Sequence, residues 1–135
     1  MMFDWIGYLH LARTIVETGQ PAGASEEARL RCAVSRAYYA AFGRAAVYLS
    51  QVFGPGFLSE DAEVHAQVAT WFRQDPDPKC KLVGKALDEL REWRNDADYE
   101  SEAGSWQKYA IAALIRAEDS ITRLAGLNGA PLDWA

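Results

Sequence analysis

The sequence predicts a single all-α domain built as an up-and-down helical bundle. Five segments carry apolar residues at helical spacing, and connections containing glycine or proline separate most of them. No segment shows the strict alternation or the enrichment in β-branched residues that is typical of a strand. The 135 residues suffice for one hydrophobic core, and no linker is long enough to divide them. Short connections between long helices favour an antiparallel arrangement.

The helices are expected over residues 3–18, 25–51, 59–74, 79–95 and 103–126. Asp4, Ser25 and Ser59 are suitable N-cap residues, because a side-chain oxygen accepts a hydrogen bond from the first turn. Residues 1–126 then form the domain, and residues 127–135 form an irregular tail. We expect Leu132 and Trp134 of this tail to dock on the bundle.

The second predicted helix is the longest and carries a stripe rich in alanine. The stripe consists of Leu30, Ala33, Val34, Ala37, Ala41, Ala45, Tyr48 and Val52. Small residues let another helix approach closely, so this helix is expected at the centre of the bundle. Such a stripe is hard to fill within one small bundle, and we therefore expect a homodimer that buries part of it.

Charge and composition exclude several classes of protein. The net charge is −5, whereas a protein that coats nucleic acid through general charge is basic. Any contact with nucleic acid must therefore be a local site built by a few arginines. No apolar run approaches the roughly 20 residues of a membrane span. The first residues lack the basic start of a signal peptide, so we expect a cytoplasmic protein that does not enter the membrane.

Cysteine and histidine offer little support for metal or cofactor chemistry. Cys32 and Cys80 belong to no CxxC motif, and in a reducing compartment we expect free thiols. The only histidines, His10 and His65, lie far apart in the chain. No phosphate-loop, dinucleotide-binding or HExxH motif is present. We expect no cofactor and no metal, and we expect His65 to be a partly exposed helical residue without a catalytic role.

Arg94 stands out on the fourth predicted helix. The inward stripe Val83, Leu87 and Leu90 advances in steps of four and three, and its next position is Arg94. An unpaired guanidinium is costly in such a place, so it requires a carboxylate or an anion. Asp98, four residues later, offers a salt bridge that would only close the helix. The alternative is a fork that binds phosphate, and both interpretations remain open.

A second polar stretch lies on the long helix. Tyr38 and Tyr39 point about 100° apart on a helix, so at least one hydroxyl is expected to reach a polar partner. The alternative is core packing by both rings. Arg36 follows Arg29 by seven residues and lies on the same side, which indicates an edge that faces an anion.

These stretches resemble the HEPN domains, small helical proteins of prokaryotes often encoded beside minimal nucleotidyltransferases. The resemblance rests on FDW and YLHLA at residues 3–5 and 8–12, SRAYYAAF at 35–42, and LR and RNDADY at 90–91 and 94–99. It implies a four-helix bundle with an additional short helix, assembled as a homodimer. Active members are metal-independent endoribonucleases whose motif is an arginine, often followed by asparagine, and a histidine after four to six further residues.

Carried over by position, Arg94 matches the motif arginine and Asn95 the residue after it. The sequence departs from the motif at the histidine, where Tyr99 stands. With an ordinary pKa of about 10, tyrosine is a poor general base, although it can donate a hydrogen bond to phosphate. We assign catalytic positions to Arg94, Asn95 and Tyr99, phosphate or RNA binding to Arg94, Arg36 and Tyr39, and a supporting role to Asp98.

Three functions follow as hypotheses. The first is a module that binds RNA or a nucleotide at a dimer cleft, with a minimal nucleotidyltransferase as a further partner. The second is an endoribonuclease toxin of a toxin–antitoxin pair, in which two copies of Arg94 stabilise the phosphorane charge without a metal. The third is a purely structural dimer.

Overall fold

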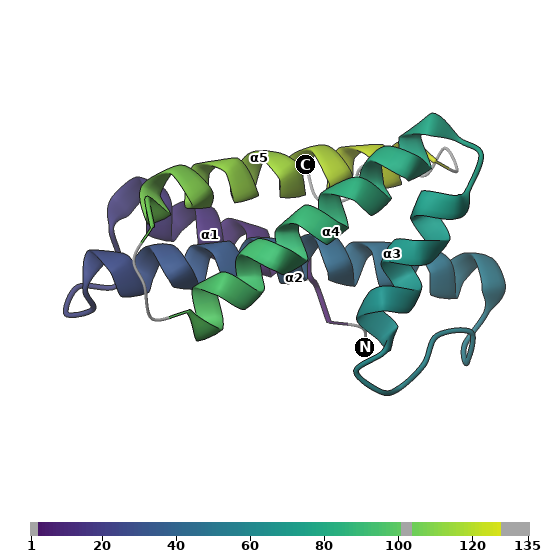
Figure 1. The fold of residues 1–135 in the computed structure, drawn as a ribbon, viewed down its shortest axis with the longest axis horizontal. Coiled ribbons are helices and arrows are strands. Elements are labelled where there is room, and N and C mark those ends of the chain that lie inside the picture. Colours follow the sequence, from purple (N-terminus) through teal and green to yellow (C-terminus); the bar gives the residue numbers. More distant parts are fainter. Residues whose placement is uncertain (1–2, 101–103, 128–135) are drawn as a thin grey trace.

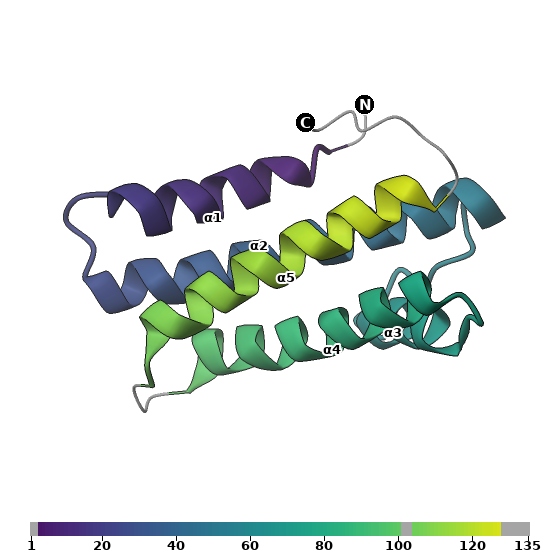
Figure 2. The same cartoon turned by 90° about the horizontal axis from the view of Figure 1, so that it is seen from above.

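The computed structural model describes residues 3–100 and 104–127, and these residues form five α-helices and no strand. The helices are α1 (Ile6–Thr18), α2 (Glu26–Phe53), α3 (Val64–Gln74), α4 (Pro78–Tyr99) and α5 (Trp106–Gly126). The predicted all-α class is therefore confirmed. The four longest helices run alternately in opposite directions along the chain, and the short α3 lies between α2 and α4 in sequence (Figure 1, Figure 2). Ala103, Leu132 and Trp134, which featured in the predictions, lie outside the described residues.

α2 is the central helix, because it packs against each of the other four. Figure 2 shows α1 on one side of α2 and α5, with α3 and α4 on the other side. The alanines of the predicted stripe, Ala33, Ala37, Ala41 and Ala45, are at most 1 % exposed. The helices of a single chain cover these alanines, so the expectation that they are hard to fill within one bundle is wrong, whereas Val52 at the end of the stripe is 48 % exposed. The alanines give no argument for a dimer.

The N-terminal ends of α2 and α3 show that a serine in the sequence predicts the start of a helix correctly in one case and not in the other. Ser25 caps α2 as predicted, because its hydroxyl accepts a hydrogen bond from the Ala28 N–H at 3.1 Å. α3, in contrast, begins at Val64 and not at Ser59. The Ser59 hydroxyl donates to the Glu63 carboxylate at 3.0 Å and accepts from the Asp61 N–H at 3.0 Å. Ser59 therefore orders the turn before the helix.

α4 extends to Tyr99, beyond its predicted end at Asn95. Arg94 consequently lies within the helix and not at its last turn. α4 continues to Tyr99 because a side chain of α2 donates hydrogen bonds to carbonyl groups at its C-terminal end.

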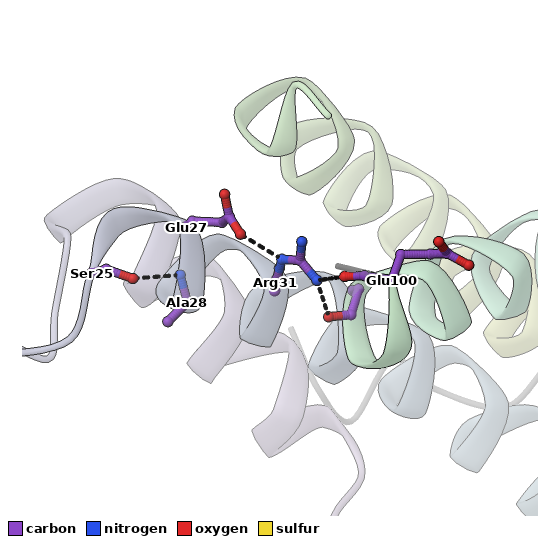
Figure 3. Close-up of polar contacts among 6 residues, drawn as sticks. Ser25, Glu27, Ala28, Arg31 and Glu100 are labelled. Carbon is purple, nitrogen blue, oxygen red and sulfur yellow. Dashed lines mark hydrogen bonds and ion pairs between the residues drawn. The ribbon is translucent and has the colours of Figure 1, made fainter. Parts of the chain in front are cut away.

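Arg31 of α2 supplies the contact that holds this turn. Its guanidinium donates to the carbonyl oxygens of Ala97, at 3.2 Å, and Glu100, while its Nε lies 3.1 Å from the Glu27 carboxylate (Figure 3). The same guanidinium lies over the Trp106 ring at 4.6 Å. The last carbonyls of a helix lack partners within the helix, and a cation there also complements the helix dipole. Arg31 thus joins α2, α4 and the start of α5.

Gly84 sets the spacing between α3 and α4. A Cβ at this position would lie 2.6 Å from the Arg73 backbone nitrogen and 3.1 Å from the Ala69 carbonyl oxygen. Only a residue without a side chain allows the two backbones to approach so closely. This approach places the beginning of α3, with His65, beside the arginines of α4.

Candidate functional site

Arg94 projects from α4 toward α2 and is only 12 % exposed. Its Nη1 lies 3.6 Å from the Asp98 carboxylate, so the predicted pair is present but long. The guanidinium carbon lies 5.5 Å from the ring centre of Tyr38 and 5.4 Å from that of Tyr39. Its Nε is buried and has no hydrogen-bond partner among the described residues. A guanidinium carries five N–H donors, so Arg94 keeps donors that an anion could occupy.

Arg91 adds a second positive charge to the same side of α4. A helix turns by about 100° per residue, so Arg91 and Arg94 point only about 60° apart. Arg91 is half-buried. The carboxylate of Asp88 lies 2.8 Å from Arg73 of α3, so Asp88 pairs with Arg73 and not with Arg91 or Arg94. α4 therefore presents two arginines to the tyrosines of α2.

His65, at the start of α3, completes the group. Its Nδ1 lies 2.5 Å from the Tyr38 hydroxyl, and its ring stacks on Phe42 with centres 4.3 Å apart. Burial and the charges of Arg91 and Arg94 lower the pKa of the His65 imidazole, which favours its neutral form. Burial also raises the pKa of Tyr38 far above its usual value, so its hydroxyl stays protonated at neutral pH. We call Tyr38, Tyr39, His65, Arg91 and Arg94 the arginine–histidine cluster.

A row of aromatic rings connects this cluster to α1. The Tyr38 and Tyr39 rings lie 5.2 Å apart, and the next ring, Tyr8 of α1, lies 6.5 Å from Tyr39. Arg36 lies over the far member of this row, 5.0 Å from the centre of Tyr8. The structure thus brings Arg94 and Tyr39 together, and it places Arg36 at the other end of the row.

Asn95 and Tyr99 lie on the exposed side of α4. Both are exposed, Tyr99 by 78 %. Tyr99 follows Arg94 by five positions on one continuous helix, which turns the two side chains about 140° apart. Asn95 and Tyr99 are themselves four positions apart and so share one outer face of α4. Within one chain, Arg94 therefore points inward while Asn95 and Tyr99 point toward solvent.

One pattern in the sequence indicates a contact of the cluster that the motif search missed. Adjacent tyrosines on a helix were expected to send at least one hydroxyl to a polar partner, and Tyr38 does so. The partner is His65, which the sequence predicts only as a partly exposed helical residue without a catalytic role. The loop between α2 and α3 separates His65 from Tyr38 in the chain, and this loop has no helical repeat from which their contact could be predicted.

The cluster combines two cations, a neutral imidazole and hydroxyl groups, which is a donor set suited to an oxyanion. Within residues 3–100 and 104–127, no three side chains of the types histidine, cysteine, aspartate and glutamate gather as a metal site would require. Cys32 and Cys80 form no disulfide. In the same part of the chain, no helix is long and apolar enough to cross a membrane.

Comparison with known proteins gave no match: no family model fits the chain, and neither a curated protein nor a solved structure resembles it.

Proposed function

We propose that this chain binds a phosphate group of RNA or of a nucleotide at the arginine–histidine cluster. The observation that carries the proposal is the state of Arg94, which is largely enclosed, pairs with its carboxylate only at 3.6 Å and leaves its Nε without a partner. Burying a charge so incompletely paired is costly, and an oxyanion that reaches the exposed part of the guanidinium would offset that cost. Arg91, one turn earlier, would share the same phosphate.

Tyr39 and Arg36 extend the proposal from a phosphate to a nucleic acid. Exposed or half-buried rings beside a cation offer faces on which bases stack, and this interaction tolerates any base sequence. Tyr39 and Tyr8 lie between Arg94 and Arg36, so two cations flank two rings. A single strand of RNA would place phosphates on the arginines and bases on the rings.

The resemblance to HEPN domains supports two further parts of the proposal. The chain works as a homodimer, and its partners include a minimal nucleotidyltransferase. In such a dimer the outer face of α4, with Asn95 and Tyr99, is available to a second copy, because both residues are exposed.

Binding of a labelled single-stranded RNA oligonucleotide, with UMP as competitor, tests the proposal. Arg94→Ala should weaken binding by at least about tenfold, since hydrogen bonds to charged groups contribute about 1.5–3 kcal/mol. Arg94→Lys should not restore it, because an ammonium lacks the planar fork. Urea denaturation of the same variants should show little change in stability.

Arg116→Ala is the matched control. Arg116 also lies 3.6 Å from its carboxylate, Glu89, but it belongs to α5 and is more exposed. Its replacement removes the same charge and a pair of the same length, and it should leave RNA binding unchanged. Equal losses in both variants would indicate general charge attraction and contradict the proposal. A loss of stability in Arg94→Ala without any effect on binding would establish the purely structural interpretation.

Cleavage of RNA is the second candidate function. The exposed face of α4 that carries Asn95 and Tyr99 favours it, because a second copy could bring these residues to the Arg94 of its neighbour. Cleavage should then persist in the presence of a metal chelator. Tyr99→Phe keeps the ring and removes the hydroxyl, so a loss of cleavage with intact binding would assign Tyr99 a chemical role. Full cleavage by Tyr99→Phe would remove it from the site.

A further inference from the structure

His65 contacts Tyr38, whose ring the Arg94 guanidinium faces, and the charges of Arg91 and Arg94 act on its imidazole. The groups that face it are Tyr38 and Tyr39 from α2 and Arg91 and Arg94 from α4. Of the acids on α4, Asp88 pairs with Arg73, whereas Asp98 pairs with Arg94 and offsets part of its charge. The surroundings of the imidazole are therefore positive on balance.

We infer that His65 takes up a proton when a phosphate group binds between Arg91 and Arg94, and that it then acts as a third cationic ligand of that phosphate. This inference rests on the proposed phosphate binding and names the group that makes it depend on pH. An anion placed between the arginines neutralises the charges that oppose protonation of the imidazole.

The contacts of His65 already suit both protonation states. With a neutral ring, the Tyr38 O–H donates to Nδ1. With a protonated ring, Nδ1–H donates and the hydroxyl oxygen of Tyr38 accepts, because a hydroxyl serves in either direction. The Phe42 ring, stacked 4.3 Å away, also attracts a cation at its face. Only burial and the two arginines favour the neutral form.

Proton NMR of the imidazole rings tests the inference directly. The chain has two histidines, and His10 is exposed on α1, so the His10→Gln variant assigns the two sets of signals. The pKa of His65 is measured alone, with UMP and with a uridine dinucleotide that has one internal phosphodiester. The charge of that diester is constant over the pH range in which histidine titrates, so a shift cannot arise from titration of the probe.

We expect a bound phosphate to raise the pKa of His65 by about one unit, equivalent to about tenfold tighter binding by the protonated form. A rise in the pKa of His65 with UMP alone assigns the site to terminal phosphates, and a rise with the dinucleotide alone assigns it to internal ones. A rise with both assigns it to the phosphate group that the two probes share. In His65→Gln, the increase in dinucleotide affinity between about pH 7.5 and about pH 5.5 should disappear.

Two results distinguish proton uptake by His65 from the phosphate binding on which it depends. If a probe binds but neither probe changes the pKa of His65, proton uptake is overturned and phosphate binding stands. If neither probe binds at any pH, phosphate binding itself is refuted, and proton uptake falls with it.

Discussion

Replacement of Gly84 by alanine tests the link between helix packing and the cluster. The added methyl would lie 2.6 Å from the Arg73 backbone nitrogen, whereas nonbonded carbon contacts are optimal at about 3.5–4.0 Å. A backbone atom cannot yield unless α3 moves as a whole. Overpacking typically costs about 1–3 kcal/mol, and the rigidity of this contact places Gly84→Ala in the upper part of that range.

Alanine also favours the helical state of the chain relative to glycine, by about 1 kcal/mol. Subtracting this gain leaves an expected decrease in the free energy of unfolding of about 1–2 kcal/mol. Urea denaturation followed by circular dichroism measures it. Gly7→Ala is the matched control, because Gly7 is also helical but a Cβ there would meet nothing within 4 Å. That variant should be more stable than the original by up to about 1 kcal/mol.

The same substitution has a second readout at the cluster. A displaced α3 would carry His65 away from Arg91 and Arg94, so its pKa should return toward the ordinary value of about 6.5. Equal stabilities of Gly84→Ala and Gly7→Ala, or an unchanged pKa of His65 in a destabilised Gly84→Ala, would refute the reasoning.

Three further predictions concern pH, capping and assembly. Because the pKa of His65 is lowered in the folded state, the unfolded chain binds more protons below about pH 6.5. The free energy of unfolding should therefore fall as the pH drops through this region, and by less in His65→Gln; identical pH profiles in urea denaturation would contradict this. Arg31→Ala should destabilise the fold by about 1.5–3 kcal/mol, since it removes charge-assisted hydrogen bonds to two carbonyls, and an unchanged urea midpoint would exclude that role. Light scattering should give twice the 15.0 kDa of one chain, with an interface of about 1,200–2,000 Å², and a monomer at micromolar concentration would refute the dimer.

Periodicity in the sequence predicted the helices and most of their buried faces. Leu30, Ala37 and Ala45 on α2, and Val83 and Leu90 on α4, are buried as the spacing required. Such patterns are local, and the helical repeat alone determines them. They also placed Arg94 on the inward side of α4, where it lies.

Features that depend on contacts between distant residues were not predictable in this way. The true end of α4 depends on Arg31, which is 66 positions away from Ala97 in the chain. The role of Ser59 depends on Glu63 in a turn that has no helical repeat. The position of His65 beside Arg94 depends on Gly84, whose missing side chain determines how close α3 comes to α4.

The position of α5 at the end of the helix order affects the sequence in which the helices can pack during folding. α5 packs on α1, α2 and α4, and ion pairs join it to both flanking helices, Arg13 with Glu118 and Arg116 with Glu89. The pairs α1–α2 and α3–α4 are neighbours along the chain, so they can associate while the polypeptide is still emerging from the ribosome. Until α5 follows, the apolar faces that it covers stay exposed, and partly folded chains of this kind tend to aggregate. Nascent chains stalled before residue 106 should therefore depend on chaperones more than chains released after α5.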